Sequence, residues 1–416
     1  MTLDRTLRPL AVLGSQPAFA EPLHVGRPNM GDPVRMLERI SDVIDTRRLT
    51  NGGPYLEEFE RRIAALAGVD HCVAMANATI GLEIAIRALG MAGEVILPSF
   101  TFIATAHVLQ WQGITPVFCD IGRDTYTIDP AAVERLITPR TTGIIGVHLY
   151  GQPCAVDRLA EIAAEHGLRL LFDSAHALGC SYGGRPVGSF GDAEVFSFHA
   201  TKFVNSMEGG AVVTADANLA DNLRLMRNFG FTFYDRVSAL GINGKMSEMS
   251  AAVGLTNLES MDAFISVNRS NYERYRQGLE GISGIRLVVS DESDKRNYQY
   301  VVIDVDETAA GLSRDTLQAV LWAENVLARR YFYPGCHRSE PYRSMFPTGT
   351  WTLPETERAA SRVLSLPTGQ AVDLDAVDTI CSLIRSAVAL APAVRSAADT
   401  RLYREALTIH DASQLA

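Results

Sequence analysis

A lysine lies at a point in the sequence where covalent chemistry can be expected. Lys202 follows the apolar run Ala193–Phe198, whose composition predicts a strand buried on both faces of a sheet. Ligands of open α/β sheets bind beyond the carboxyl ends of such strands. A neutral lysine amine can form a Schiff base with a carbonyl compound, whereas a loop lysine is more commonly a solvated surface charge. The neighbouring residues decide between these two interpretations.

A carboxylate ends another predicted buried strand. Asp173 follows the apolar run Leu170–Phe172, and a poorly solvated carboxylate there requires a cationic partner. A protonated pyridine nitrogen would be such a partner. An N-cap for the turn Ala175–Leu178 explains the aspartate equally well. His176, in the same turn, could hydrogen-bond a ring substituent or serve a structural role.

Residues Asn77–Thr79 form a candidate phosphate site. They follow a predicted strand and open a predicted helix, where backbone N–H groups and the Thr79 hydroxyl attract an anion. An ordinary N-cap explains Thr79 equally well. Ser197 ends another strand and could add a second hydroxyl, and Phe102 could stack on a flat ring or belong to the core. A lysine, a carboxylate, a phosphate site and an aromatic ring at consecutive strand ends are what a pyridoxal phosphate site requires.

Short apolar runs and longer helical patterns alternate in the part of the chain that must position these residues. The runs are apolar throughout, which predicts strands of a mostly parallel sheet, at His71–Ala74, Val95–Leu97, Pro116–Cys119, Gly143–Val147, Leu168–Phe172, Ala193–Phe198 and Gly210–Thr214. The predicted helices are Tyr55–Leu66, Thr79–Leu89, Ile103–Gln112, Ala131–Leu136 and Val156–His166. This order predicts an α/β fold with a mostly parallel central sheet flanked by helices.

The second half of the chain has a different pattern. A long helical pattern covers Ser247–Gln277. Beyond it we expect strands near Ile285–Val289 and Tyr298–Val305 and helices near Arg314–Asn325, Pro354–Val363 and Asp375–Leu390. The predicted organisation is an N-terminal arm (1–30), a large α/β domain (31–255), a smaller C-terminal α+β domain (256–390) and a tail (391–416).

The composition limits the possible classes of protein. The 416 residues are 47% hydrophobic and 21% charged, which excludes a disordered chain, a collagen-like repeat and a disulfide miniprotein. A net charge of −10 disfavours nucleic-acid binding. Six scattered cysteines without a Cys-x-x-Cys pair predict no metal site and indicate a cytoplasmic protein. No apolar run is long enough to span a membrane, and we interpret Ala18–Ala20 as part of a mature N-terminal arm and not as a signal-peptide cleavage site.

Several segments carry a resemblance to a known family. They are Pro98–Ala106, Asp173–Ala177, Ser197–Lys202, Glu208–Gly210 and Met246–Ala252. From about Asn51 to Leu255, and more loosely to Leu390, the chain resembles the DegT/DnrJ/EryC1/StrS sugar aminotransferases. The resemblance implies a fold type I enzyme that depends on pyridoxal 5′-phosphate (PLP) and acts on nucleotide-linked keto sugars.

The resemblance implies roles for the residues around the cofactor ring. Lys202 would hold the cofactor covalently and shuttle protons, and Asp173 would pair with the ring nitrogen. His176 stands where the family often has Gln and would contact the ring hydroxyl. Phe102 would cover one face of the ring. Relatives with His in place of the lysine perform deoxygenation, so Lys202 argues against that activity.

The resemblance also assigns the phosphate end of the site. Ala78 and Thr79 would bind the phosphate, with help from Ser197. Asn243 matches an asparagine that reaches the phosphate of the neighbouring subunit, which implies a homodimer with shared active sites. The next two residues, Gly244 and Lys245, stand where the family often has Tyr-Arg before the Met, which leaves the substrate contacts open.

The segment Arg329–His337 is a candidate for binding the nucleotide-sugar, through Tyr331, Tyr333 and His337, although a structural loop explains it equally well.

The expected reaction moves an amino group from an amino acid, by resemblance glutamate, to C4 of a dTDP-4-keto-6-deoxyhexose. Two alternatives stay open: a PLP-dependent sugar dehydratase or lyase, and a non-enzymatic sensor of small molecules on the same fold.

Overall fold

Seven strands form the central sheet of the computed structural model, which describes residues 7–288, 293–347 and 349–397. The strands lie in the order β2-β10-β9-β6-β5-β3-β4. Within this sheet only β10 runs antiparallel to its neighbours, so the prediction of a mostly parallel sheet is confirmed. The bounds are β2 (His71–Met75), β3 (Glu94–Pro98), β4 (Thr115–Cys119), β5 (Thr141–Val147), β6 (Arg169–Asp173), β9 (Ala193–Ser197) and β10 (Gly210–Thr214).

Helices cover both faces of this sheet, because successive strand residues point to opposite sides. In β2, Cys72 and Ala74 belong to one hydrophobic core, whereas Val73 and Met75 belong to another. The first core is closed by α2 (Pro54–Ala67), α5 (Pro130–Leu136), α6 (Val156–His166) and α8 (Glu248–Glu259). The second is closed by α3 (Ala78–Ala88), α4 (Ala104–Trp111) and α7 (Ala217–Arg227). The strands and helices predicted here are all present, with bounds within two residues.

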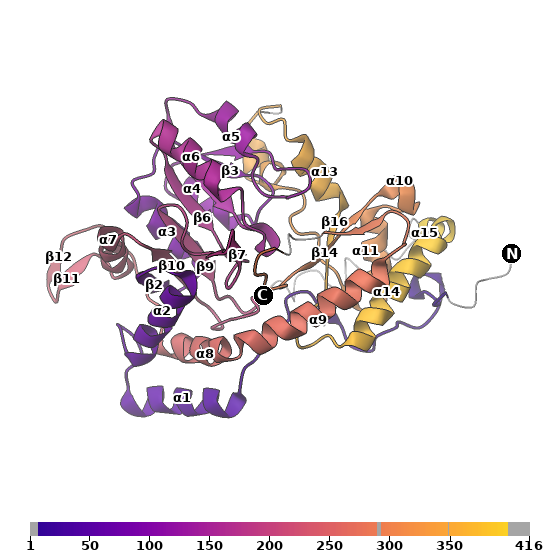
Figure 1. Cartoon of the computed structure of the whole chain (residues 1–416), viewed down its shortest axis with the longest axis horizontal. Coiled ribbons are helices and arrows are strands. Elements are labelled where there is room, and N and C mark those ends of the chain that lie inside the picture. Colours follow the sequence, from indigo (N-terminus) through magenta and orange to yellow (C-terminus); the bar gives the residue numbers. More distant parts are fainter. Residues whose placement is uncertain (1–6, 289–292, 348, 398–416) are drawn as a thin grey trace.

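The prediction of one continuous helix over Ser247–Gln277 is wrong. The segment forms two helices, α8 and α9 (Met261–Leu279), separated by Ser260. The Ser260 N–H bonds the carbonyl of Asn257, and serine competes with the helical backbone for hydrogen bonds, which favours a helix end here. From this break α9 runs away from the central sheet and packs against α14 (Leu374–Ala389), as Figure 1 shows.

A second, smaller sheet lies beside α9. Its three strands, β13 (Ile285–Leu287), β14 (Val301–Val305) and β16 (Val363–Leu366), are antiparallel and lie in the order β13-β14-β16. Together with α9, α11 (Arg314–Ala323) and α14 they enclose a third hydrophobic core. Val289, the last residue of one predicted strand, lies outside the described residues.

The N-terminal segment packs against this smaller sheet and its helices. Leu10 and Val12 are buried in the third core. Further along, β1 (Leu23–His24) pairs in parallel with β15 (Val326–Leu327). The chain then forms α1 (Pro33–Thr46), which lies along α8 (Figure 1). The predicted arm thus contributes to the packed structure, at least over the residues described.

The remaining described elements are short. They are η1 (Ala11–Leu13), η2 (Leu149–Gly151), β7 (Ser181–Tyr182), β8 (Arg185–Pro186), β11 (Phe231–Phe233), β12 (Arg236–Val237), α10 (Glu307–Ala310), η3 (Cys336–Arg338), α12 (Tyr342–Met345), α13 (Pro354–Arg362) and α15 (Ala391–Ala397). Residues 1–6 of the predicted arm and 398–416 of the predicted tail lie outside the described residues. In the described ranges no single helix is long and apolar enough to cross a membrane; α14 and α15, bent by 89°, meet that test only as a pair, by length and composition.

Candidate active site

Neighbouring strands of the central sheet bring the predicted site residues to one edge. Asp173 is the last residue of β6 and lies beside Val195 of the parallel strand β9. Ser197 ends β9, and Gly210, its partner, begins β10. Lys202 lies in the loop between these two strands, close enough for its charge to act on the pKa of Asp173. The lysine and the aspartate therefore share this edge, as their sequence positions predict.

The surroundings of Lys202 suit an amine that works without its charge. Burial lowers the pKa of Lys202 to about 8, although the Asp173 carboxylate favours the charged form. A neutral fraction is therefore available near neutral pH, and Schiff-base formation and proton transfer both require it. The backbone N–H of Lys202 donates to the His199 carbonyl at 2.8 Å, which fixes the turn that carries the side chain.

Asp173 has few partners for a buried carboxylate. Its Oδ2 accepts the Thr105 hydroxyl at 2.9 Å, and its Oδ1 accepts the Ala175 N–H at 3.2 Å. Burial raises the pKa of Asp173 despite these bonds and the charge of Lys202. Asp173 thus supports the following turn, as one interpretation predicts, and its pairing with a ring nitrogen stays a prediction. Sequence reasoning missed Thr105, whose only signal is a hydroxyl within an apolar helical pattern.

A second buried carboxylate supports the turn after Asp173. Glu194, in β9, accepts the backbone N–H groups of Gly188 at 2.7 Å and Phe190 at 2.9 Å, and also the Ser174 hydroxyl. The glutamate is fully buried, so these bonds replace the hydration that it loses. Sequence reasoning missed Glu194 too, although an acidic residue inside an apolar strand pattern is a usable signal.

The N-terminus of α3 lies next to Ser197. Asn77 is the N-cap of this helix and accepts a backbone N–H at 2.9 Å, so the alternative that Thr79 is the cap is wrong. Thr79 is exposed one residue into the helix. A Cβ on Gly210 would lie 2.5 Å from the nitrogen of Ala78, so only glycine permits this approach of β10 to the helix. Because Gly210 pairs with Ser197, the serine and the helix N-terminus meet at one place, where a phosphate would be stabilised.

Two rings lie near the same edge. Phe102 is 56% exposed, so it is not part of the core, and its ring centroid lies 6.3 Å from that of Phe332. His176 is buried, and the charge of Lys202 acts on it. The Nδ1 atom of His176 is buried without a hydrogen-bond partner among the residues that the structure describes. An orphaned polar atom of this kind fits a contact with a bound molecule.

A pocket of about 640 Å³ opens beside Phe102. Tyr331 and Tyr333 line it, as do Arg329 and Arg330, so the pocket combines aromatic faces with positive charge. Both tyrosines therefore lie where the sequence predicts contacts with a nucleotide-sugar, and that role stays a prediction.

His337 lies elsewhere. Its ring is buried, its Nδ1 lies 2.7 Å from the Ser99 hydroxyl, and its Nε2 lies 3.4 Å from the Glu357 carboxylate. These contacts hold the ring in the packing between β3 and α13, and the residue is not part of the pocket lining. A contact between His337 and the substrate stays a prediction.

Asn243 follows an exposed hairpin formed by β11 and β12, which projects from the body of the molecule (Figure 1). The hairpin carries the exposed rings of Phe231, Phe233 and Tyr234, the last of them 88% exposed. Asn243 is itself exposed and forms an isolated bridge with Asn228 at the base of the hairpin. Its contact with a neighbouring subunit stays a prediction.

The described residues fit PLP group by group. The N-terminus of α3 with Ser197 suits the phosphate, Asp173 suits the ring nitrogen, His176 suits the ring hydroxyl, and Lys202 suits the aldehyde. Within residues 7–288, 293–347 and 349–397, no group of three His, Cys, Asp or Glu side chains could hold a metal ion.

The profile of the DegT/DnrJ/EryC1/StrS aminotransferase family matches residues 33–385. The chain is also similar to a dTDP-4-amino-4,6-dideoxy-D-glucose transaminase of Shigella dysenteriae. The two sequences are 36% identical over 365 residues, which make up 88% of this chain and 99% of the relative.

Solved structures show the same similarity. The crystal structure of DesI in the presence of its TDP-sugar product has 51% sequence identity and a TM-score of 0.89, covering 93% of this chain and 98% of DesI. DesV of S. venezuelae has 33% identity and a TM-score of 0.80, covering 85% of this chain and 94% of DesV.

Proposed function

The chain belongs to the DegT/DnrJ/EryC1/StrS aminotransferase family, and we propose that it transfers the amino group of glutamate to C4 of a dTDP-4-keto-6-deoxyhexose. It is a PLP-dependent aminotransferase that makes an amino sugar from a nucleotide-linked keto sugar. The observation that carries the assignment is the shared sheet edge, where a lysine with a lowered pKa lies near a buried carboxylate that accepts only two hydrogen bonds among the described residues.

The side chains divide the work of the reaction. The bound cofactor supplies an electron sink for the carbon that loses a proton. Lys202, uncharged, would take the proton from the donor carbon and deliver a proton to the cofactor within the first half of the reaction; in the second half it would take a proton from the cofactor and deliver one to the sugar carbon. Asp173 holds positive charge on the ring nitrogen, and Thr105 orients its carboxylate through the bond to Oδ2. The N-terminus of α3 and Ser197 anchor the phosphate, which keeps the reacting atoms beside the lysine.

The names of the relatives support the choice of sugar. The Shigella dysenteriae relative is a transaminase of dTDP-4-amino-4,6-dideoxy-D-glucose, and DesI was crystallised with a TDP-sugar product. The pocket beside Phe102 adds a physical reason, since Arg329 and Arg330 can offset the charge of a diphosphate while Tyr331 and Tyr333 offer faces for a base.

The direct experiment loads the purified enzyme with PLP, adds glutamate and then dTDP-4-keto-6-deoxyglucose, and identifies the products by NMR. We expect 2-oxoglutarate and a sugar with nitrogen at C4. Nitrogen at C3 would refute the regiochemistry. Loss of water from the sugar without gain of nitrogen would favour the dehydratase alternative. Binding without turnover of any keto sugar would favour the sensor.

The working unit that we propose is a homodimer in which each Asn243 completes the site of the partner. The exposed rings of Phe231, Phe233 and Tyr234 support it, because such a cluster on a projecting hairpin is typical of a protein interface. Mixed dimers of Lys202→Ala and Asn243→Ala chains provide the test. If Asn243 acts across the interface, one site of each mixed dimer is intact and activity returns on mixing; if it acts within its own chain, mixing restores nothing.

The compartment that we propose is the cytoplasm. All six cysteines are free and buried, which is the usual state of cysteines in a reducing compartment.

A further inference from the structure

We infer that Tyr300 is a positioning residue that fixes His176 in the tautomer with its proton on Nδ1, so that this nitrogen donates a hydrogen bond to the ring hydroxyl oxygen of the cofactor. The inference rests on the proposed function for the identity of the acceptor. It does not rest on it for the tautomer, which is a property of the chain alone. No feature of the sequence singles out Tyr300, which comes from the segment that leads into β14.

The contact between the two side chains is direct. The Tyr300 hydroxyl lies 3.2 Å from Nε2 of His176, and the ring centroids are 4.5 Å apart. The ring of Phe332 also lies near the histidine, with centroids 6.0 Å apart and the ring planes nearly parallel, at 12°. The imidazole therefore has two aromatic neighbours, and only one of its nitrogens has a partner among the described residues.

The segment that carries Tyr300 also binds the backbone of the histidine. Asn297, which is buried, donates through Nδ2 to the His176 carbonyl at 2.8 Å and to the Leu178 carbonyl at 3.1 Å. The segment before β14 therefore fixes both the turn and the ring that it carries. A positioning role requires such a rigid second contact, since a single hydroxyl would not fix the ring alone.

The charge states of the groups that face the ring show that both side chains are neutral. Burial raises the pKa of Tyr300, so its hydroxyl keeps its proton and can donate. Burial lowers the pKa of His176 well below the usual value, and the charge of Lys202 lowers it further. The imidazole is therefore neutral, with one N–H and one acceptor nitrogen. Asp173, in the same turn, makes its own bonds to Thr105 and Ala175.

A tyrosine hydroxyl can donate or accept, so the 3.2 Å contact fits both tautomers; in the tautomer that we infer, Tyr300 donates to Nε2 and the proton resides on Nδ1. That atom is buried and has no partner in the described part of the chain. A buried donor without an acceptor carries a desolvation cost, which a bound ring oxygen would remove. Donation to this oxygen would withdraw electron density from it and would lower the proton affinity of the Lys202 nitrogen in the PLP-loaded enzyme.

The first test uses the enzyme without cofactor, because the tautomer of His176 can be measured there independently of the proposed function. ¹⁵N spectra of histidine-labelled protein report which ring nitrogen carries the proton, and a His176→Gln variant identifies the His176 signals among those of nine histidines. We expect the proton on Nδ1 in the wild type and a mixture of tautomers in Tyr300→Phe. A wild-type proton on Nε2, or a tautomer that Tyr300→Phe leaves unchanged, overturns the inference.

The second test follows the visible absorbance of the PLP-loaded enzyme against pH. We expect Tyr300→Phe to raise the pH midpoint by roughly 0.5–1 unit, the size expected for loss of one hydrogen bond. Tyr150→Phe is the matched control, because the Tyr150 hydroxyl donates to the Tyr331 carbonyl and not to the histidine, so the midpoint of this variant should not move. In a His176→Gln background Tyr300→Phe should also have no effect, and a shift of the same size there would show that Tyr300 does not act through His176.

Discussion

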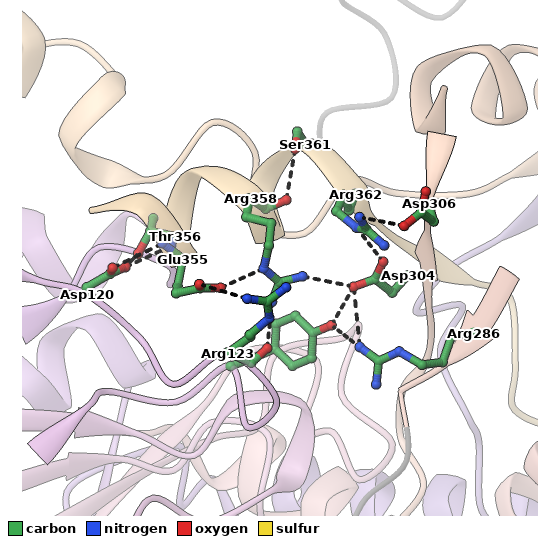
Figure 2. Close-up of polar contacts among 11 residues, drawn as sticks. Asp120, Arg123, Arg286, Asp304, Asp306, Glu355, Thr356, Arg358, Ser361 and Arg362 are labelled. Atoms are coloured by element: carbon green, nitrogen blue, oxygen red, sulfur yellow. Dashed lines mark hydrogen bonds and ion pairs between the residues drawn. The ribbon is translucent and has the colours of Figure 1, made fainter. Parts of the chain in front are cut away.

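Two buried carboxylates of this molecule lie in opposite surroundings. Asp173, at the end of β6, is 6% exposed and accepts bonds only from Thr105 and the Ala175 N–H among the described residues. Asp304, in β14, is 1% exposed and accepts from Arg362 at 2.7 Å, Tyr126 at 2.8 Å and, at longer range, two further arginines. Figure 2 shows the arginines converging on Asp304. The hydrogen-bonding capacity of the Asp304 carboxylate is filled, whereas that of the Asp173 carboxylate is not.

Asp304 joins the smaller sheet to α13 and to a loop of the central sheet region. Arg358 and Arg362, both in α13, bind it, and Arg358 also donates to the carbonyl of Arg123. Asp120 accepts the N–H of Thr356 at 2.7 Å and thereby caps α13 from a residue far away in the sequence (Figure 2). Such a network stabilises the packing and leaves Asp304 no capacity for a ligand.

The two environments shift the pKa values in opposite directions. Burial raises the pKa of Asp173. Burial also opposes ionisation of Asp304, but the hydrogen bonds from Arg362 and Tyr126 outweigh it and lower the pKa. The difference teaches that burial alone does not mark a functional carboxylate, whereas burial with unfilled hydrogen-bonding capacity does.

Asp173→Asn should give the largest effect on activity. Loss of the negative charge beside the ring nitrogen should reduce kcat roughly 100- to 1,000-fold, the size expected for breaking a buried ion pair. Because the charge of Asp173 is costly to bury without a partner, the variant without cofactor should melt at or above the wild-type temperature. Steady-state kinetics and thermal melts check both parts, and near-normal turnover would contradict the pyridinium role.

Asp304→Asn should have the reverse pattern. The substitution keeps the shape but leaves Arg286, Arg358 and Arg362 without their shared anion, and should cost about 2–3 kcal/mol of unfolding free energy, discounted because these arginines are partly exposed. Denaturant unfolding measures the loss, and PLP absorbance should be unchanged. A stable variant with altered absorbance would remove the distinction between the two sites.

The pH dependence sharpens the same contrast. A lowered folded-state pKa means that the ionised Asp304 contributes stability above its unfolded pKa of about 3.9, and that this contribution is lost as the pH falls through the folded value. The stability gap between wild type and Asp304→Asn should therefore be full at pH 7 and shrink toward pH 3. A gap that stays constant over this range would show that the charge is not responsible.

Thr105→Val should give the smallest effect. It removes the hydroxyl that donates to Asp173 Oδ2 and should lower kcat about fivefold with little change in KM, since one hydrogen bond is worth about 1 kcal/mol. Thr105→Ser keeps the donor and is the matched control. Equal losses in both variants would indicate a packing role and not a hydrogen-bonding one.

The sequence predicted elements and strand-end residues better than contacts between distant segments. The apolar runs identify every strand of the central sheet, and strand ends identify Lys202 and Asp173, because these signals are local. The bond between Thr105 and Asp173 spans 68 residues, and the one between Tyr300 and His176 spans 124. Tertiary packing brings such partners together, and no local sequence pattern predicts them. The contact between Ser99 and His337, which spans 238 residues, is another example.

The central claim is that the amine of Lys202 joins PLP, and the chain allows a clean test because it contains only three lysines, Lys202, Lys245 and Lys295. The PLP-loaded enzyme is reduced with borohydride, digested and mapped by mass spectrometry. The account predicts the reduced cofactor on Lys202 alone. An adduct on Lys245 or Lys295, or none on any lysine, would contradict it.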